Sequence, residues 1–216
     1  MMVKGVIFDL DGVLVSTDEY HYLSWKRIAD KLGIHFDRTI NNKLRGISRM
    51  ESLEIVLGAR SSEFDSAQKV AIATEKNEQY RKFLSQMSPS SVAQSVCETL
   101  EKIRQAGLKT AIGSSSKNTG YILERTDLAK YFDAVCDGND ITRSKPDPEV
   151  FLKAAKFLGL NPAECLVVED GHSGIDAAKS GGFTAVAIGD ATTHKNADFT
   201  IKNLNDLLEI LNITTI

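Results

Sequence analysis

Two aspartates stand at the end of an apolar run near the start of the chain. Asp9 closes the run that begins at Val3, and Asp11 follows two residues later. At this spacing both carboxylates can project to the same side of the backbone. Two like charges held so close are costly unless a cation or a reaction uses them. The sequence Asp-Leu-Asp-Gly also fits a plain turn or a calcium-loop fragment, but Tyr20 stands where a calcium loop needs an acid twelve positions along from Asp9.

A second stretch combines hydroxyl groups with one cation, directly after a predicted strand and at the start of a predicted helix. It reads Gly113, Ser114, Ser115, Ser116, Lys117 and Asn118. Hydroxyls, free backbone N–H groups and a lysine at a helix N-terminus can form a phosphate cradle. The alternative is a helix start that is capped by its own serines.

Two further loops carry charged groups. Lys145 precedes Pro146, whose ring fixes the backbone ahead of the next helix. Glu169 and Asp170 end another apolar run, so they could face Asp9 across a sheet. Converging carboxylate oxygens suit Mg²⁺. Taken singly, a solvated loop lysine and an acidic turn explain these residues equally well.

Alternating strands and helices are predicted to position these four loops. Continuous apolar runs predict strands at 3–10, 108–113, 134–137, 165–169 and 184–188, and helices with glycine stops are predicted at 92–106, 148–158 and 174–180. This order predicts an α/β fold with a Rossmann-like parallel sheet and right-handed crossovers. All four charged loops then lie at the carboxyl ends of the strands, where open α/β sheets bind their ligands.

The segment from about residue 15 to 89 departs from this alternation. Helices are predicted there at 18–32, 49–57 and 65–85, and no strand. An all-helical cap domain at 15–89 is therefore predicted to be inserted into a core domain formed by 1–14 and 90–216.

Together, in this order, the four loops resemble the haloacid-dehalogenase-like superfamily of phosphotransferases. Its four motifs match Asp9 and Asp11, then Ser114, then Lys145, then Glu169 with Asp170. The resemblance implies that Asp9 is the nucleophile that forms an aspartyl-phosphate, and that Asp11 is the general acid/base. It implies that Ser114 and Lys145 hold the transferring phosphoryl group. It also implies that Mg²⁺ is held by Asp9, the backbone carbonyl of Asp11 and Asp170, with Glu169 either bound to the ion or next to it.

The predicted cap carries polar residues on faces that are otherwise apolar. Thr17, His21 and Trp25 are four residues apart on one helix face, although Thr17 could be a plain N-cap and Trp25 plain core. Lys76 falls inside an apolar face, where an unpaired amine is costly unless its stem snorkels to water. Between two cap helices, Gly46, Ile47 and Ser48 are flanked by Arg45 and Arg49, and spacing alone allows either arginine to bind phosphate.

These cap segments are similar to those of the β-phosphoglucomutase family. That likeness implies that Thr17, His21 and Lys76 couple cap closure to Asp11, and that Trp25, Gly46, Ile47 and Ser48 line the substrate site. It implies that Arg49, Ser116, Lys117 and Asn118 bind the phosphate that is not being transferred. Ser16 and Ser115 depart from the pattern, where Asp and Ala are common. The implied reaction converts β-D-glucose 1-phosphate to glucose 6-phosphate through glucose 1,6-bisphosphate, which also serves as activator.

Three other functions remain open. A sugar-phosphate phosphatase could use the same core, because water and a sugar hydroxyl can both accept the phosphoryl group. A non-catalytic binding module is disfavoured because Asp9 and Asp11 are both present. Phosphonate hydrolysis would need a Schiff-base lysine, for which Lys76 is the candidate in the cap.

Composition narrows the class of protein. The 216 residues include 26 Lys or Arg and 29 Asp or Glu, which gives a net charge of −3 and no basic excess for nucleic acid. No apolar run is long enough to cross a bilayer, and three separated cysteines favour a reducing compartment. We therefore expect a cytoplasmic, monomeric enzyme that acts on a small sugar phosphate.

Overall fold

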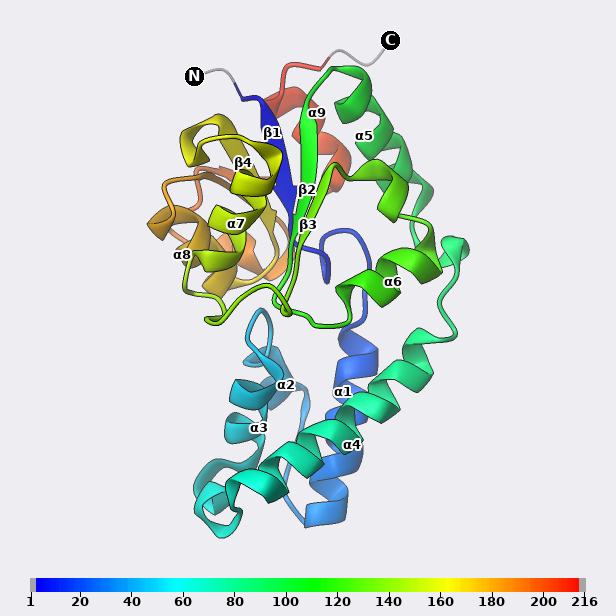
Figure 1. The fold of residues 1–216 in the computed structure, drawn as a ribbon, viewed down its shortest axis with the longest axis vertical. Coiled ribbons are helices and arrows are strands. Elements are labelled where there is room, and N and C mark those ends of the chain that lie inside the picture. Colours follow the sequence, from blue (N-terminus) through cyan, green and yellow to red (C-terminus); the bar gives the residue numbers. More distant parts are fainter. Residues whose placement is uncertain (1–2, 214–216) are drawn as a thin grey trace.

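A parallel sheet forms the centre of the larger part of the molecule (Figure 1). The computed structural model describes residues 3–213. The strands are β1 (Gly5–Phe8), β2 (Lys109–Gly113), β3 (Ala134–Cys136), β4 (Cys165–Glu169), β5 (Thr184–Ala187) and β6 (Phe199–Thr200). Their spatial order is β3-β2-β1-β4-β5-β6, and each neighbouring pair is parallel. The predicted Rossmann-like topology is confirmed.

Helices cover both faces of this sheet, because successive side chains of each buried strand point to opposite sides. Val6 and Phe8 of β1 share one apolar cluster with α5 (Gln94–Gln105), α6 (Thr119–Thr126) and α9 (Leu207–Ile210). Ile7 belongs to the cluster on the other face, with α7 (Glu149–Leu158) and α8 (His172–Ser180). The two clusters explain why the central strands are continuous apolar runs.

Four helices form a separate unit below the carboxyl ends of the strands in Figure 1. They are α1 (Asp18–Leu32), α2 (Arg38–Asn42), α3 (Arg49–Leu57) and α4 (Ser66–Leu84). Trp25, Ile28, Leu53 and Val56 are at the centre of an apolar cluster of their own. This packing supports the inserted cap; its limits at 15–89 stay a prediction.

The sequence missed the shortest elements. β6 has two exposed residues, and α2 has five, so neither is long enough to show a hydrophobic period. Asp37 starts α2 by accepting a hydrogen bond from the backbone N–H of Ile40. Pro148 precedes α7 as its N-cap instead of lying in its first turn.

Strand order decides where the candidate site lies. The chain pairs β2 and then β3 on one side of β1, and crosses to the other side to form β4. Asp9, Ser114 and Asp170 directly follow β1, β2 and β4, so they gather at the point where the strand order reverses. Within residues 3–213 no helix combines the length and the hydropathy that a bilayer crossing requires.

Candidate active site

Three carboxylates and one ammonium group meet at this edge of the sheet. Nζ of Lys145 donates to Oδ1 of Asp9 at 2.6 Å and to Oε2 of Glu169 at 2.7 Å. Carboxylate oxygens of Asp9, Glu169 and Asp170 lie within 4.8 Å of one another. Lys145 is 1% exposed, so it is not a solvated loop lysine. The fold therefore brings the loop of Lys145 and the loop of Glu169 and Asp170 together with Asp9.

The charges of this cluster do not cancel. One ammonium group faces three carboxylates, which leaves a local excess of two negative charges when all three are ionised. Burial raises the pKa of Asp170, and repulsion from Glu169 and then from Asp9 raises it further. Burial lowers the pKa of Lys145, but the carboxylates of Asp9 and Glu169 more than offset this effect and raise it. A hard divalent cation such as Mg²⁺ fits this donor set and this excess of charge.

Close packing holds Asp170 in place. A Cβ on Gly12 would lie 1.9 Å from Oδ2 of Asp170, and Gly12 adopts a φ of +82°. A side chain at position 12 would therefore both strain the backbone and displace the carboxylate. Glu169 is held by a second bond, because its Oε1 accepts the backbone N–H of Gly171 at 3.1 Å.

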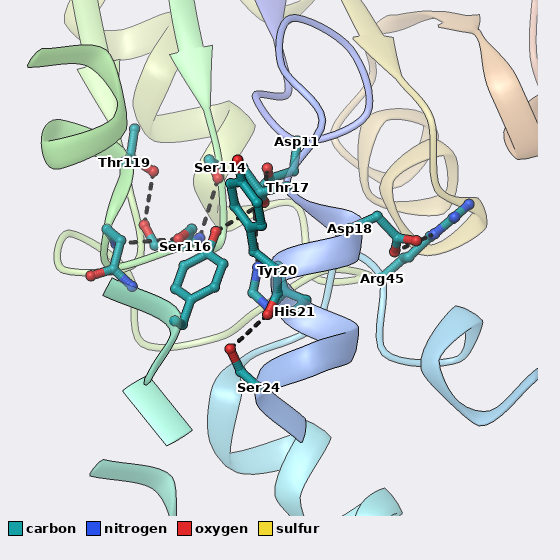
Figure 2. Close-up of polar contacts among 12 residues, drawn as sticks. Asp11, Thr17, Asp18, Tyr20, His21, Ser24, Arg45, Ser114, Ser116 and Thr119 are labelled. Carbon is teal, nitrogen blue, oxygen red and sulfur yellow. Dashed lines mark hydrogen bonds and ion pairs between the residues drawn. The ribbon is translucent and has the colours of Figure 1, made fainter. Parts of the chain in front are cut away.

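The carboxylate of Asp11 lies outside this metal-type cluster. It accepts a hydrogen bond from the hydroxyl of Thr17, and that hydroxyl is also 2.9 Å from the hydroxyl of Tyr80 (Figure 2 shows Asp11 and Thr17). Thr17 occupies the N-cap position of α1, but its side chain makes no capping bond. Burial raises the pKa of Asp11 to about 7, so this carboxyl group can both give and take a proton near neutral pH.

Lys76 and His21 join the cap to Asp11. Nζ of Lys76 lies 2.8 Å from Nδ1 of His21, and Nε2 of His21 lies 3.9 Å from Oδ2 of Asp11. The Lys76 ammonium also lies 4.6 Å from the ring centre of Tyr80 and 5.1 Å from that of Trp25. Trp25 is thus part of the cap core and lines the cavity as well. Burial and the nearby Arg49 lower the pKa of Lys76 to about 7.

A cavity of about 870 Å³ separates the core site from the cap, and most of the predicted residues line it. Among them are Asp9, Asp11, His21, Trp25, Gly46, Ile47, Ser48, Arg49, Lys76, Ser114, Ser115, Ser116, Lys117, Asn118 and Asp170. Three other predicted residues, Thr17, Lys145 and Glu169, are buried behind this surface and act on it through Asp11 and Asp9. The four loops and the cap therefore share one cavity.

The two candidate arginines have different surroundings. Arg45 pairs with Asp18 of α1, with Nε at 3.4 Å from Oδ1, and with Asp190 of the core (Figure 2 shows the first pair). Arg49 makes no ion pair with any carboxylate of the described part of the chain, and burial lowers its pKa. Ser48 starts α3 with a capping box that includes Glu51, so Arg49 is held at the first position of that helix.

The serine loop partly caps itself. The hydroxyl of Ser114 accepts the N–H of Ser116 at 3.2 Å, and the hydroxyl of Ser116 accepts the N–H of Asn118 at 3.2 Å (Figure 2). Each hydroxyl keeps its own proton to donate to an anion. Oγ of Ser115 is buried and has no hydrogen-bond partner between residues 3 and 213. Lys117 is exposed at the rim of the cavity.

Asn118 joins the loop to the cap. Its side-chain N–H donates to Oδ1 of Asn77 at 2.9 Å, and its Oδ1 accepts from Arg81 at 3.3 Å. The prediction that Asn118 binds the distal phosphate therefore requires it to share or exchange these contacts. The sequence places Tyr80 on the apolar face of α4 and assigns no role to Arg81. Tyr80 is 1% exposed, as that face predicts, but the sequence does not show that its hydroxyl reaches Thr17.

Similarity to known proteins agrees with this geometry. Residues 3–182 match the family model described as haloacid dehalogenase-like hydrolase. The chain belongs to the haloacid dehalogenase-like hydrolase family. It is 39% identical to a β-phosphoglucomutase of Bacillus subtilis over 97% of this chain and 94% of the relative. It is 31% identical to a phosphorylated carbohydrates phosphatase of Thermotoga maritima, with 85% and 84% covered.

A solved structure of a β-phosphoglucomutase is also similar to this chain. A β-phosphoglucomutase from Clostridium difficile superposes with a TM-score of 0.93 at 34% identity, covering 98% of this chain and 96% of that chain. The haloacid dehalogenase-like core and the helical cap are thus both present in a relative of similar length.

Proposed function

We propose that the protein interconverts β-D-glucose 1-phosphate and glucose 6-phosphate. The phosphoryl group passes through an aspartyl-phosphate on Asp9, and glucose 1,6-bisphosphate is both the intermediate and the activator. The observation that carries this proposal is the guanidinium group of Arg49, which lines the same cavity as Asp9 and pairs with no carboxylate of residues 3–213. A half-buried cation without a counter-charge favours an anionic ligand. A mutase needs such a second phosphate site, because its bisphosphate must turn round and rebind.

The reacting groups are placed for two successive transfers. An oxygen of Asp9 attacks phosphorus, the bond from phosphorus to the sugar oxygen breaks, and Asp11 gives its proton to that oxygen. In the second transfer Asp11 removes the proton from the C6 hydroxyl of bound β-glucose 1-phosphate, and that oxygen attacks the phosphorus on Asp9. The bond between phosphorus and the Asp9 oxygen breaks, which frees the carboxylate and forms glucose 1,6-bisphosphate. Lys145 and Ser114 hold the oxygens of the moving group, where negative charge is spread.

Asp9, Asp170 and the neighbouring Glu169 would hold Mg²⁺, together with the backbone carbonyl of Asp11. When bound, this ion would balance the charge of the carboxylates and of the phosphoryl oxygens. Glu169 is already bonded to Lys145 and to Gly171, which supports a place for it beside the ion more than in contact with it.

The cap residues and the serine loop of the core are proposed to bind and orient the sugar phosphate. Arg49, Lys117 and Ser116 would hold the phosphate that is not transferred. His21 and Lys76 would couple closure of the cap over this phosphate to the position of Asp11. Arg45 is engaged by Asp18 and Asp190, which supports Arg49 as the phosphate-binding arginine.

One chain contains every group named here, which supports a monomer acting on a small sugar phosphate, without nucleic acid or membrane. Three free cysteines support the cytoplasmic location that the sequence predicts, since a reducing compartment keeps thiols unpaired.

Hydrolysis of a sugar phosphate is the second candidate, because a phosphatase is among the similar relatives. A coupled assay distinguishes the two. β-Glucose 1-phosphate, Mg²⁺ and a trace of glucose 1,6-bisphosphate are added, and glucose 6-phosphate and free phosphate are followed together. Glucose 6-phosphate in large excess supports the mutase. Free phosphate alone would overturn it and leave the phosphatase.

A further inference from the structure

One ion pair crosses from the cap to the core without touching the reacting groups. Arg45 lies in the cap, between α2 and α3, and its Nη1 donates to Oδ2 of Asp190. Asp190 belongs to the core, in the turn Gly189–Thr193 that follows β5. The Arg45 side chain is 29% exposed and the Asp190 side chain is 62% exposed, so water screens the pair and its effect is small.

The backbone beside this pair also touches the core. Oγ of Ser173, near the start of α8, is 3.4 Å from the carbonyl oxygen of Arg45. A Cβ on Gly46 would lie 2.6 Å from the same Oγ. Gly46 therefore lets the cap loop come within contact distance of α8, and the Arg45–Asp190 pair lies at this contact.

The Arg45–Asp190 pair lines two neighbouring cavities. The large cavity of about 870 Å³ holds Asp9, and a second hollow of about 790 Å³ opens on the side of His172 and Thr193. Arg45 and Asp190 line both, and so does Asp170, which lies next to the reacting carboxylate. The two hollows therefore adjoin at the ion pair.

We propose that Arg45 and Asp190 form a latch that keeps the cap closed over the aspartyl-phosphate and separates the second hollow from it. The latch thereby sets how much phosphoenzyme is lost to water. The benefit of the latch to the enzyme rests on the proposed function, because a mutase must keep its phosphoryl group from water. The experiment below requires only that Asp9 becomes phosphorylated. Arg45 and Asp190 are positioning residues in this account and do not contact the phosphoryl group.

The loss reaction that the latch suppresses is a simple hydrolysis. A water oxygen attacks the phosphorus on Asp9, the bond between phosphorus and the Asp9 oxygen breaks, and Asp11 accepts a proton from the water. The products are inorganic phosphate and the free Asp9 carboxylate. An open latch raises the rate of this step because it admits water, whereas transfer to a bound sugar gains nothing.

The test measures the lifetime of the phosphoenzyme in the full-length protein. The enzyme is phosphorylated with acetyl phosphate and Mg²⁺, the donor is removed, and the remaining aspartyl-phosphate is quantified with time. Arg45→Met and Asp190→Asn should each shorten the lifetime about two- to five-fold, the range that a partly exposed ion pair supports. The double variant Arg45→Met with Asp190→Asn should shorten the lifetime no more than either single change, because both changes break the same ion pair.

A matched control removes an exposed ion pair that lies within the cap. Lys31 pairs with Glu75 at 2.8 Å, and Lys31→Met should leave the lifetime unchanged. Unchanged lifetimes in both single variants, or losses that add in the double variant, would overturn the latch. This outcome is independent of the coupled assay, because a phosphatase also forms the aspartyl-phosphate.

Discussion

Nζ of Lys76 lies 2.8 Å from Nδ1 of His21, and both groups belong to the cap. Burial lowers the pKa of His21, and the nearby charge of Lys76 lowers it further. Neutral His21 can therefore accept a hydrogen bond from Lys76 at Nδ1 while its Nε2–H faces Asp11. This arrangement links a cation of the cap to the carboxyl group of Asp11.

Lys76→Met should stabilise the protein while reducing its activity. The pKa of Lys76 falls from 10.5 to about 7 on folding, so the unfolded chain binds more protons between these values. The cost of burying the amine is therefore full below pH 7 and fades as the pH rises toward 10.5. The variant should be more stable by on the order of 1–3 kcal/mol at pH 7, and this gain should shrink by pH 10. Urea unfolding at several pH values measures it, and a gain that does not change with pH would contradict the account.

Arg49→Ala should distinguish the site of the phosphate that is transferred from the site of the phosphate that is not. Losing charge-assisted hydrogen bonds of about 1.5–3 kcal/mol corresponds to a roughly 10- to 150-fold fall in kcat/KM for β-glucose 1-phosphate. Hydrolysis of an aryl phosphate, which has no second phosphate, should fall much less. Arg60→Ala is the matched control, since Arg60 pairs with Glu63 on the exposed end of the cap. Equal losses with both substrates would remove Arg49 from the distal site.

Tyr80→Phe tests a residue to which the sequence assigns only a place on an apolar helix face. The change keeps the ring against His21, with centres 4.1 Å apart, and removes the hydroxyl that bonds to Thr17. We expect a loss of about 0.5–1.5 kcal/mol in stability and a lower kcat. In a double-mutant cycle with Thr17→Val, the two losses should not add. Additive losses would mean that the two hydroxyls do not act together.

Mg²⁺ should stabilise the folded protein through Asp170. The excess negative charge of the carboxylate cluster predicts a higher thermal midpoint with millimolar Mg²⁺ and a loss of that gain in EDTA. Asp170→Asn should lose most of the gain, while Asp176→Asn, at an exposed position of α8, should keep it. The same gain in both variants would place the ion elsewhere.

The core could be predicted because its signals are local and strong. Buried parallel strands are continuous apolar runs, and each reacting loop directly follows one, so strand order alone brings Asp9, Ser114 and Asp170 together. The cap was harder, because its polar contacts join distant segments. Nothing in the spacing shows that Arg45 meets Asp190 or that Tyr80 meets Thr17, since these contacts depend on how α1 and α4 pack and on how the cap sits on the core.

Rapid quenching with glucose 1,6-bisphosphate labelled in one phosphate tests the central claim most directly. The label should appear first on a peptide that contains Asp9. When unlabelled β-glucose 1-phosphate is added, it should move to glucose 1,6-bisphosphate and then to glucose 6-phosphate, with little in free phosphate, and Asp9→Asn should take up none. Label that passes straight to free phosphate, or that is found on a peptide without Asp9, would contradict a transfer between Asp9 and the sugar.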